Sequence, residues 1–158
     1  MDSASVIALA VILSASFATA MTAAAYRPDD WYAALRKPWW TPPNWLFPLA
    51  WAILYALMSA SAFLVWSFAQ PGEGTVPLVV YAVQLGLNAL WSPVFFGMRR
   101  MGLAYLVVVS LWIAVLATAV LFFPINYWAG LLLMPYLVWV TVASFLNLSV
   151  WRLNRTSA

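Results

Sequence analysis

The chain has 158 residues, of which 66% are hydrophobic and only 7% are charged, and its formal net charge is +3. This composition excludes an ordinary water-soluble domain and is typical of a protein whose solvent is lipid. The absence of cysteine and histidine also excludes disulfides, thiolate chemistry, the commonest zinc sites and a histidine proton relay.

Five stretches are long and apolar enough to cross a bilayer, which takes about 20 residues in an α-helix. They cover residues 4–25, 45–68, 76–97, 101–123 and 127–151. The sequence therefore predicts an all-α fold, a single domain of five transmembrane helices. The first stretch ends in Ala18-Thr19-Ala20, which is similar to a signal-peptidase site, but no basic residue precedes it, so we interpret it as a retained helix.

The longest connection, residues 26–44, is rich in aromatic residues and proline. We expect it to pack over the helix ends as a lid rather than act as a flexible linker. Its candidate lid residues are Trp31, Tyr32, Lys37, Pro38, Trp39, Trp40, Pro42 and Pro43. Thr41, followed by two prolines, predicts the N-cap and first turn of the second helix. Three later prolines are expected to kink or loosen their helices: Pro48, Pro93 and Pro135.

The third predicted helix carries amides and a hydroxyl at depth. Gln84, Asn88 and Ser92 lie at spacing i, i+4 and i+8, on one face. An unpaired amide is costly in hydrocarbon, so this face must point inward, to another helix or to a polar ligand group. On the same helix, Ala82 and Gly86 form a small-xxx-small pair that lets a second helix approach closely, which predicts a homodimer through this surface.

The chain contains eleven tryptophans. Those near predicted helix ends fit the aromatic belt of a membrane interface: Trp31, Trp39, Trp40, Trp45, Trp128 and Trp151. Four others lie deeper, where an indole needs packing space and a partner for its N–H: Trp51, Trp91, Trp112 and Trp139. Core packing explains this deep set, and so does a planar, largely apolar ligand held between the rings.

All seven basic residues flank predicted helix ends. They are Arg27, Arg36 and Lys37 in the first connection, Arg99 and Arg100 in the third, and Arg152 and Arg155 in the tail. Five spans place these three segments on one side of the membrane, and the positive-inside rule makes that side cytoplasmic, with the N-terminus outside. Topology therefore explains the positive charge, and no nucleic-acid partner is expected. No predicted helix has a charged residue near its middle, which disfavours a proton-coupled pump.

Four motifs follow one another along nearly the whole chain. They are Trp31-Tyr32 through Lys37-Pro38-x-Trp40-x-Pro42-Pro43, Phe47-Pro48-x-x-Trp51, Gln84-Leu85-x-x-Asn88-x-x-Trp91-Ser92-Pro93-x-Phe95-Phe96-Gly97, and Pro135-Tyr136-x-x-Trp139-x-x-x-Ala143-x-x-x-Asn147. In this combination the sequence resembles the TspO/MBR family of tryptophan-rich sensory proteins, also called translocator proteins or peripheral benzodiazepine receptors.

The resemblance implies a five-helix fold, often dimeric, whose pocket under the first connection binds porphyrins and synthetic isoquinoline or benzodiazepine-type ligands. By position, the family pocket would be lined by Tyr32, Trp51, Asn88, Trp139 and Ala143. The deep polar and aromatic groups add three candidates to this site: Gln84, Trp91 and Asn147. Trp139, Ala143 and Asn147 follow at i, i+4 and i+8, which predicts one face with room for a flat ligand beside a large ring.

A tetrapyrrole such as protoporphyrin IX or haem is favoured over a sterol as the ligand. The vertebrate relatives end the fifth helix with a sterol motif built around Tyr and Arg, and here Trp151 stands where that Tyr would be. No obligatory cofactor is expected, because the usual strong axial ligands of haem iron are absent. A porphyrin would bind through its ring face or its propionates, with Arg36, Lys37 or a loop indole.

Three functions compete at this point. The leading hypothesis is a membrane receptor or sensor for porphyrin-like molecules that aids their transport and takes part in stress signalling. The second is an enzyme that degrades porphyrin in light, with Trp51 or Trp139 as the reacting group and the chemistry supplied by the porphyrin itself. The third is a structural or partner-binding membrane protein whose aromatic residues only pack. All-helical spans favour a bacterial membrane.

Overall fold

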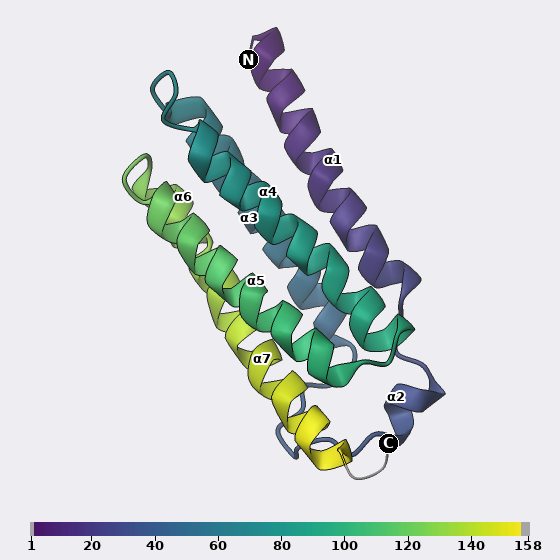
Figure 1. Ribbon diagram of the computed structural model, residues 1–158. Helices are drawn as coiled ribbons and strands as arrows, with labels where there is room; N and C mark the ends of the chain where they lie inside the picture. The colour runs from purple at the N-terminus through teal and green to yellow at the C-terminus, as the bar shows by residue number, and fades with distance from the viewer. Residues whose placement is uncertain (1, 156–158) are drawn as a thin grey trace.

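The computed structural model describes residues 2–155, and within that range every regular element is a helix. Five helical spans are long and apolar enough to cross a membrane, which confirms the predicted all-α class (Figure 1). They are α1 (Ser3–Ala25), α3 (Leu46–Phe68), α4 (Thr75–Ser92) continued by η1 (Pro93–Gly97), α5 (Met101–Phe122), and α6 (Tyr127–Leu132) continued by α7 (Met134–Asn154). The short helix α2 (Asp30–Ala34) lies in the first connection.

Two of the predicted helices are interrupted near prolines. The third changes at Pro93 into the π-helical turn η1, in which the Met98 amide donates to the Pro93 carbonyl at 2.8 Å. The fifth is divided at Leu133, with Pro135 in the first turn of α7, and it ends at Asn154 rather than at residue 151. Pro48 lies in the first turn of α3, where proline is tolerated, and that helix runs unbroken.

The predicted capping role of Thr41 is wrong. Helix α3 begins at Leu46, and its N-cap residue Trp45 makes no capping hydrogen bond through its side chain. The Thr41 hydroxyl instead donates to the Pro38 carbonyl at 2.7 Å, which closes a turn inside the first connection. The two prolines that follow disfavour a helical conformation for the residue before each of them, so the helix starts later.

The long helices contact one another unequally. Helix α5 packs closely against α4 and α7, and α1 packs against α3 and α4. Helix α3 packs mainly against α1 and α6 and touches α4 and α7 much less. Because the backbones of α3, α4 and α7 approach one another little, side chains fill the space between them. The fully buried core residues include Met58 of α3 and Tyr136 of α7.

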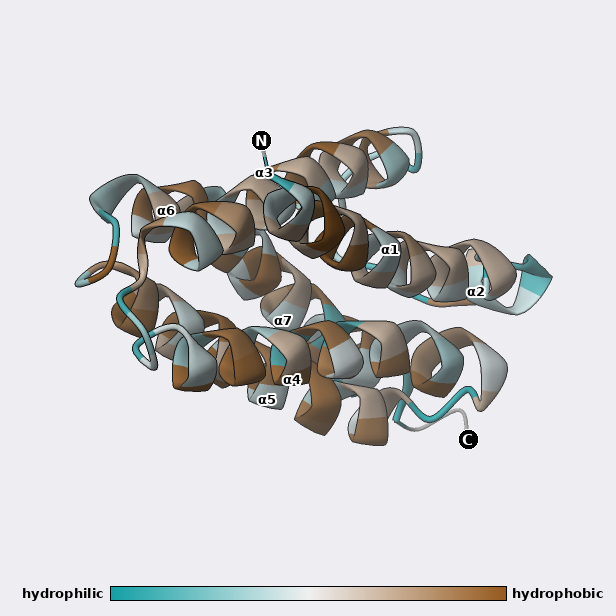
Figure 2. Ribbon diagram, turned by 90° about the horizontal axis from the view of Figure 1, so that it is seen from above, coloured by the Kyte–Doolittle hydropathy of each residue, from teal (hydrophilic) through white to brown (hydrophobic). Residues whose placement is uncertain are grey.

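The outer surface of the bundle is apolar, as expected for contact with lipid tails. Large hydrophobic side chains are exposed on α1, where Phe17 is an example, and on α4, where Val79 is an example. Hydrophilic residues gather in the connections and around α2 (Figure 2). Helix α1 buries few residues, and its Ser16 hydroxyl shares a 2.8 Å hydrogen bond with the hydroxyl of Ser59 on α3. Such a bond helps to hold helices together where lipid removes the hydrophobic drive between them.

The two small residues predicted for a dimer contact lie on the outward side of α4. Ala82 and Gly86 are both exposed, and a Cβ added at Gly86 meets nothing within 4 Å. This surface is open to a second helix, and the homodimer itself stays a prediction.

A pair of glycine substitutions tests the packing of the fifth span. Gly130 of α6 is buried, and a Cβ placed there overlaps the ring of Phe123. We expect Gly130→Ala to lower the free energy of unfolding by about 1–3 kcal/mol, as overpacking does. Gly86→Ala is the matched control, and it should be neutral or slightly stabilising, because the added Cβ meets nothing and alanine favours a helix more than glycine does. Thermal unfolding in detergent, followed by circular dichroism, measures both, and equal stability of the two variants would contradict this packing.

Candidate functional site

The first connection packs against the ends of three long helices. Tyr32 of α2 is buried, and its ring meets the rings of Phe95 and Phe96 edge-on, at centroid distances of 6.1 and 5.4 Å. The ring of Trp31 meets Phe95 at 5.9 Å. These aromatic rings form a cluster, here called the lid cluster, with three residues of α5 and α7: Ala104, Leu146 and Val150. The connection therefore covers this end of the bundle, as a lid would, and we call residues 26–44 the lid.

Charged groups fasten the outer side of the lid. The guanidinium of Arg99, in the turn before α5, contacts the carboxylate of Asp29 at 3.0 Å and lies 5.5 Å from the ring centre of Trp31. The ammonium of Lys37 lies 4.5 Å from the ring centre of Tyr32 and donates to two backbone carbonyls. The predicted lid residue Trp39 is 95% exposed and points away from the bundle.

Asp29 also caps helix α2. Its carboxylate accepts a hydrogen bond from the Tyr32 amide at 3.1 Å. That bond, supported by Arg99, holds the pKa of Asp29 below its ordinary value of 3.8. Burial raises the pKa of the Tyr32 phenol, which stays neutral at physiological pH.

Deeper in the bundle, aromatic side chains of α3 and α7 face one another. The rings of Phe47 and Trp139 meet edge-on at 5.7 Å, and those of Trp51 and Tyr136 meet at 6.0 Å. Tyr55 lies one turn beyond Trp51, with its ring 5.6 Å away. We call these five residues the aromatic site. Trp51 and Trp139 are both only partly buried, so each indole retains accessible ring surface.

The predicted amide face of α4 forms hydrogen bonds between helices. The Tyr136 hydroxyl donates to Gln84 Oε1 at 2.9 Å and accepts from Asn88 Nδ2 at 2.7 Å. The Tyr55 hydroxyl donates to Asn88 Oδ1 at 3.0 Å. Within residues 2–155 every buried side-chain nitrogen or oxygen has a partner. The amides therefore link α3, α4 and α7 in this structure, and their contact with a ligand stays a prediction.

Trp91 and Asn147 lie between the aromatic site and the lid cluster. The indole of Trp91 donates to Asn147 Oδ1 at 3.0 Å, and Asn147 Nδ2 donates to the Met101 carbonyl at 2.9 Å. Trp91 also stacks on Phe95 at 5.0 Å. Asn147 thus faces α4 and α5, whereas Trp139 faces α3, because eight residues turn a helix about 80° past two full turns.

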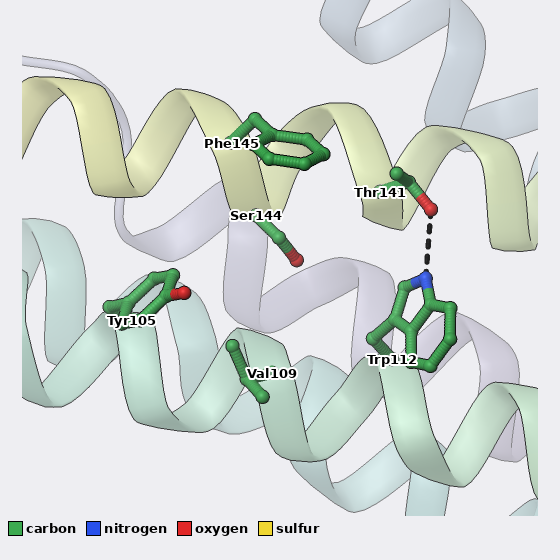
Figure 3. Close-up of a pocket in the computed structure, with 6 residues that line it drawn as sticks. All are labelled: Tyr105, Val109, Trp112, Thr141, Ser144 and Phe145. Carbon is green, nitrogen blue, oxygen red and sulfur yellow. Dashed lines mark hydrogen bonds between the residues drawn. The ribbon is translucent and has the colours of Figure 1, made fainter.

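Trp112 lies between α5 and α7, away from the aromatic site. Its indole donates to the Thr141 hydroxyl at 2.8 Å, beside a hollow of about 250 Å³ between α5 and α7 (Figure 3). A second hollow, of about 480 Å³, is lined by α1, α3 and α4 and includes Trp66 and Tyr81. None of the eight predicted ligand-binding residues lines either hollow.

Sequence reasoning missed four residues that organise the site, and one of them, Tyr55, was not singled out at all. Phe47 and Tyr136 were seen only as parts of motifs, and Asn154 lay beyond the predicted end of the fifth helix. A signal for two of them exists in the spacing of Tyr136, Asn147 and Asn154, which falls at i, i+11 and i+18. At about 100° per residue these three polar groups share one face, and all three are buried.

Comparison of the sequence with known proteins identifies relatives of the chain that has this lid, these aromatic rings and these buried amides. The model of the TspO/MBR family matches residues 5–152. The chain belongs to the TspO/MBR family. The tryptophan-rich sensory protein of Cereibacter sphaeroides is 50% identical to it over 142 residues, which cover 90% of this chain and 88% of that relative.

Two further relatives extend the comparison. Protein CrtK of Rhodobacter capsulatus is 49% identical over 146 residues, covering 92% of this chain and 91% of the relative. The human translocator protein is 41% identical over 128 residues, covering 78% and 75%. Family membership and the five spans make this chain a multi-pass integral membrane protein of a sensory and translocator family, with a receptor or sensor role.

The Tyr136 hydroxyl can be removed with little change of shape. Tyr136→Phe leaves Gln84 Oε1 and Asn88 Nδ2 without their partner, and each buried unsatisfied group costs about 1–3 kcal/mol. We expect a clear fall in thermal stability in detergent. Tyr127→Phe, at a residue that is 64% exposed, is the control and should be neutral. A Tyr136→Phe protein as stable as the wild type would show that the network contributes little.

The lowered pKa of Asp29 predicts how the lid responds to acid. Because the pKa is depressed in the folded state, the contribution of this carboxylate is complete above its ordinary value of 3.8 and is lost as pH falls through the folded pKa. Hydrogen exchange of the α2 amides should therefore be faster in Asp29→Asn than in the wild type at about pH 6, and the difference should be smaller at a pH well below 3.8. A difference of the same size at both pH values would contradict this role.

Proposed function

We propose that this membrane receptor or sensor binds porphyrin-like molecules at the aromatic site beneath the lid, and that this binding serves their transport and stress signalling. The observation that carries the proposal is the pair of partly exposed indoles, Trp51 and Trp139, on helices that touch each other little. Flat conjugated molecules stack on such ring faces. The same chemistry accommodates the isoquinoline and benzodiazepine-type ligands that the family resemblance implies.

Ala143 beside these rings and Arg36 on the lid suit a flat ligand with an acidic edge. Ala143 lies one turn beyond Trp139 and is partly exposed, so its methyl group leaves space beside the indole. Arg36, on the lid, has an exposed side chain, and arginine pairs with carboxylates in a two-pronged geometry. A porphyrin carries both features, a conjugated ring and propionate groups. A sterol lacks them, which is why it is the less favoured ligand.

The arrangement of charge supports an orientation in the membrane. The lid, the turn between η1 and α5, and the C-terminal end of α7 lie at one end of the bundle, opposite the N-terminus (Figure 1). All seven basic residues of the sequence belong to these three segments. By the positive-inside rule we propose that this end is cytoplasmic, in a bacterial membrane, so that the lid opens toward the cytoplasm.

Titration with protoporphyrin IX in the dark, followed by quenching of tryptophan fluorescence in detergent, tests the ligand. Saturable quenching is expected in the wild type. Trp139→Phe and Ala143→Leu should each weaken binding roughly two- to tenfold, the first through lost stacking area and the second through steric conflict. Trp128→Phe is the control, because Trp128 is 64% exposed at the opposite end of the bundle. Unchanged affinity in both site variants would place the ligand elsewhere.

The same samples separate a receptor from an enzyme. The saturated protein is illuminated while the porphyrin absorption spectrum is recorded. An unchanged spectrum fits a receptor or carrier, whereas loss of porphyrin that Trp51→Phe abolishes would replace the receptor proposal with light-dependent degradation. A complete lack of saturable quenching would leave the aromatic site as packing alone.

A further inference from the structure

The last turn of α7 holds the lid by an unusual pair of hydrogen bonds. The side-chain amide of Asn154 accepts from the Arg36 amide at 3.1 Å and donates to the Arg36 carbonyl at 3.0 Å. One side chain thus satisfies both backbone groups of a residue 118 positions away. Asn154 is only 7% exposed, and its nitrogen also donates to the Val150 carbonyl of its own helix at 2.7 Å.

This contact differs from the ion pair at the other end of the lid. The side chains of Arg99 and Asp29 are 55% and 43% exposed, so water and salt weaken their attraction. The Asn154 amide is shielded from water, and breaking its bonds leaves buried polar groups that must find new partners. The two contacts lie on either side of helix α2, and the Asn154 contact is the one on the side that leads to α3.

We propose that Asn154 is the latch of the lid, and that ligand enters or leaves the aromatic site when the two bonds between Asn154 and Arg36 break. The latch stands on the geometry alone, whereas its effect on ligand passage rests on the proposed function. The latch positions the lid and contacts no ligand. It lies on the buried face of α7 that also carries Tyr136 and Asn147, so the helix that contributes Trp139 to the aromatic site also holds the lid closed.

The sequence of the lid supplies a direct readout of its opening. Trypsin cleaves after lysine and arginine but poorly before proline. Arg27 precedes Pro28 and Lys37 precedes Pro38, so the bond between Arg36 and Lys37 is the one readily cleaved bond in residues 26–44. Its carbonyl is the group that Asn154 holds. A fragment ending at Arg36 therefore reports release of the latch.

The experiment compares Asn154→Leu, which keeps the size but removes both bonds, with the wild type in detergent. Cleavage after Arg36 should be about tenfold faster in the variant, because proteolysis follows the open population. Leu153→Ala is the matched control, since Leu153 lies in the same turn and is 42% exposed. Asn154→Asp, which keeps the acceptor and loses the donor, should fall between them. Equal helical content by circular dichroism shows that each variant is folded.

The second arm measures protoporphyrin association and release by stopped-flow fluorescence. Both rates should rise in Asn154→Leu, with a smaller change in affinity, because the latch contacts the lid and not the ligand. Unchanged cleavage after Arg36 would overturn the latch, whatever the protein binds. Faster cleavage with unchanged porphyrin rates would overturn the gating of the site by this latch. If the wild type binds no porphyrin, the proposed function fails and the cleavage result still decides the latch.

Discussion

The hydroxyl of Tyr136 stands at the centre of a hydrogen-bond network that joins three helices. The residue is fully buried, so no water can take the place of these bonds. It bonds to Gln84 and Asn88 of α4, and Asn88 is in turn bonded by Tyr55 of α3. In lipid the drive to bury apolar surface between helices is weak, so association depends on close packing and on hydrogen bonds of this kind. The remainder of the site is arranged around this network, because it fixes how α3 stands relative to α4 and α7.

The spacing of those helices explains why aromatic residues are concentrated here. Helix α3 touches α4 and α7 little, and large rings such as Trp51 and Trp139 occupy the space between them. Rings can fill such a space and still retain accessible faces, which small aliphatic side chains cannot do. A region that packs the bundle can therefore also receive a flat ligand, so the two interpretations of the deep tryptophans are compatible for this pair. Trp112 lies apart from this pair, because it bonds to Thr141 and lines a separate hollow between α5 and α7.

The fold was largely predictable, and the site only in part. The number of spans, their approximate positions and the lid follow from local composition, because twenty apolar residues in a row have few alternatives to a membrane helix. The division of the fifth span at Leu133 and its end at Asn154 were not predicted. The motifs singled out Trp51 and Trp139, which belong to two neighbouring aromatic pairs between α3 and α7, but they did not separate the face of Trp139 from that of Asn147. The capping prediction for Thr41 was wrong because a threonine followed by prolines gives the same local pattern whether the helix starts directly after it or four residues later, at Leu46.

By itself, the sequence determined that the chain crosses a membrane five times and that its basic residues gather in three segments. Those properties depend on the hydropathy and charge of each segment, which can be summed residue by residue without knowing how the helices pack. Only the tertiary structure decided which polar groups meet, such as Asn154 with the backbone of Arg36 and Tyr136 with Gln84. These pairs join residues far apart in the sequence, and their partners depend on helix rotation and packing, which no local pattern encodes.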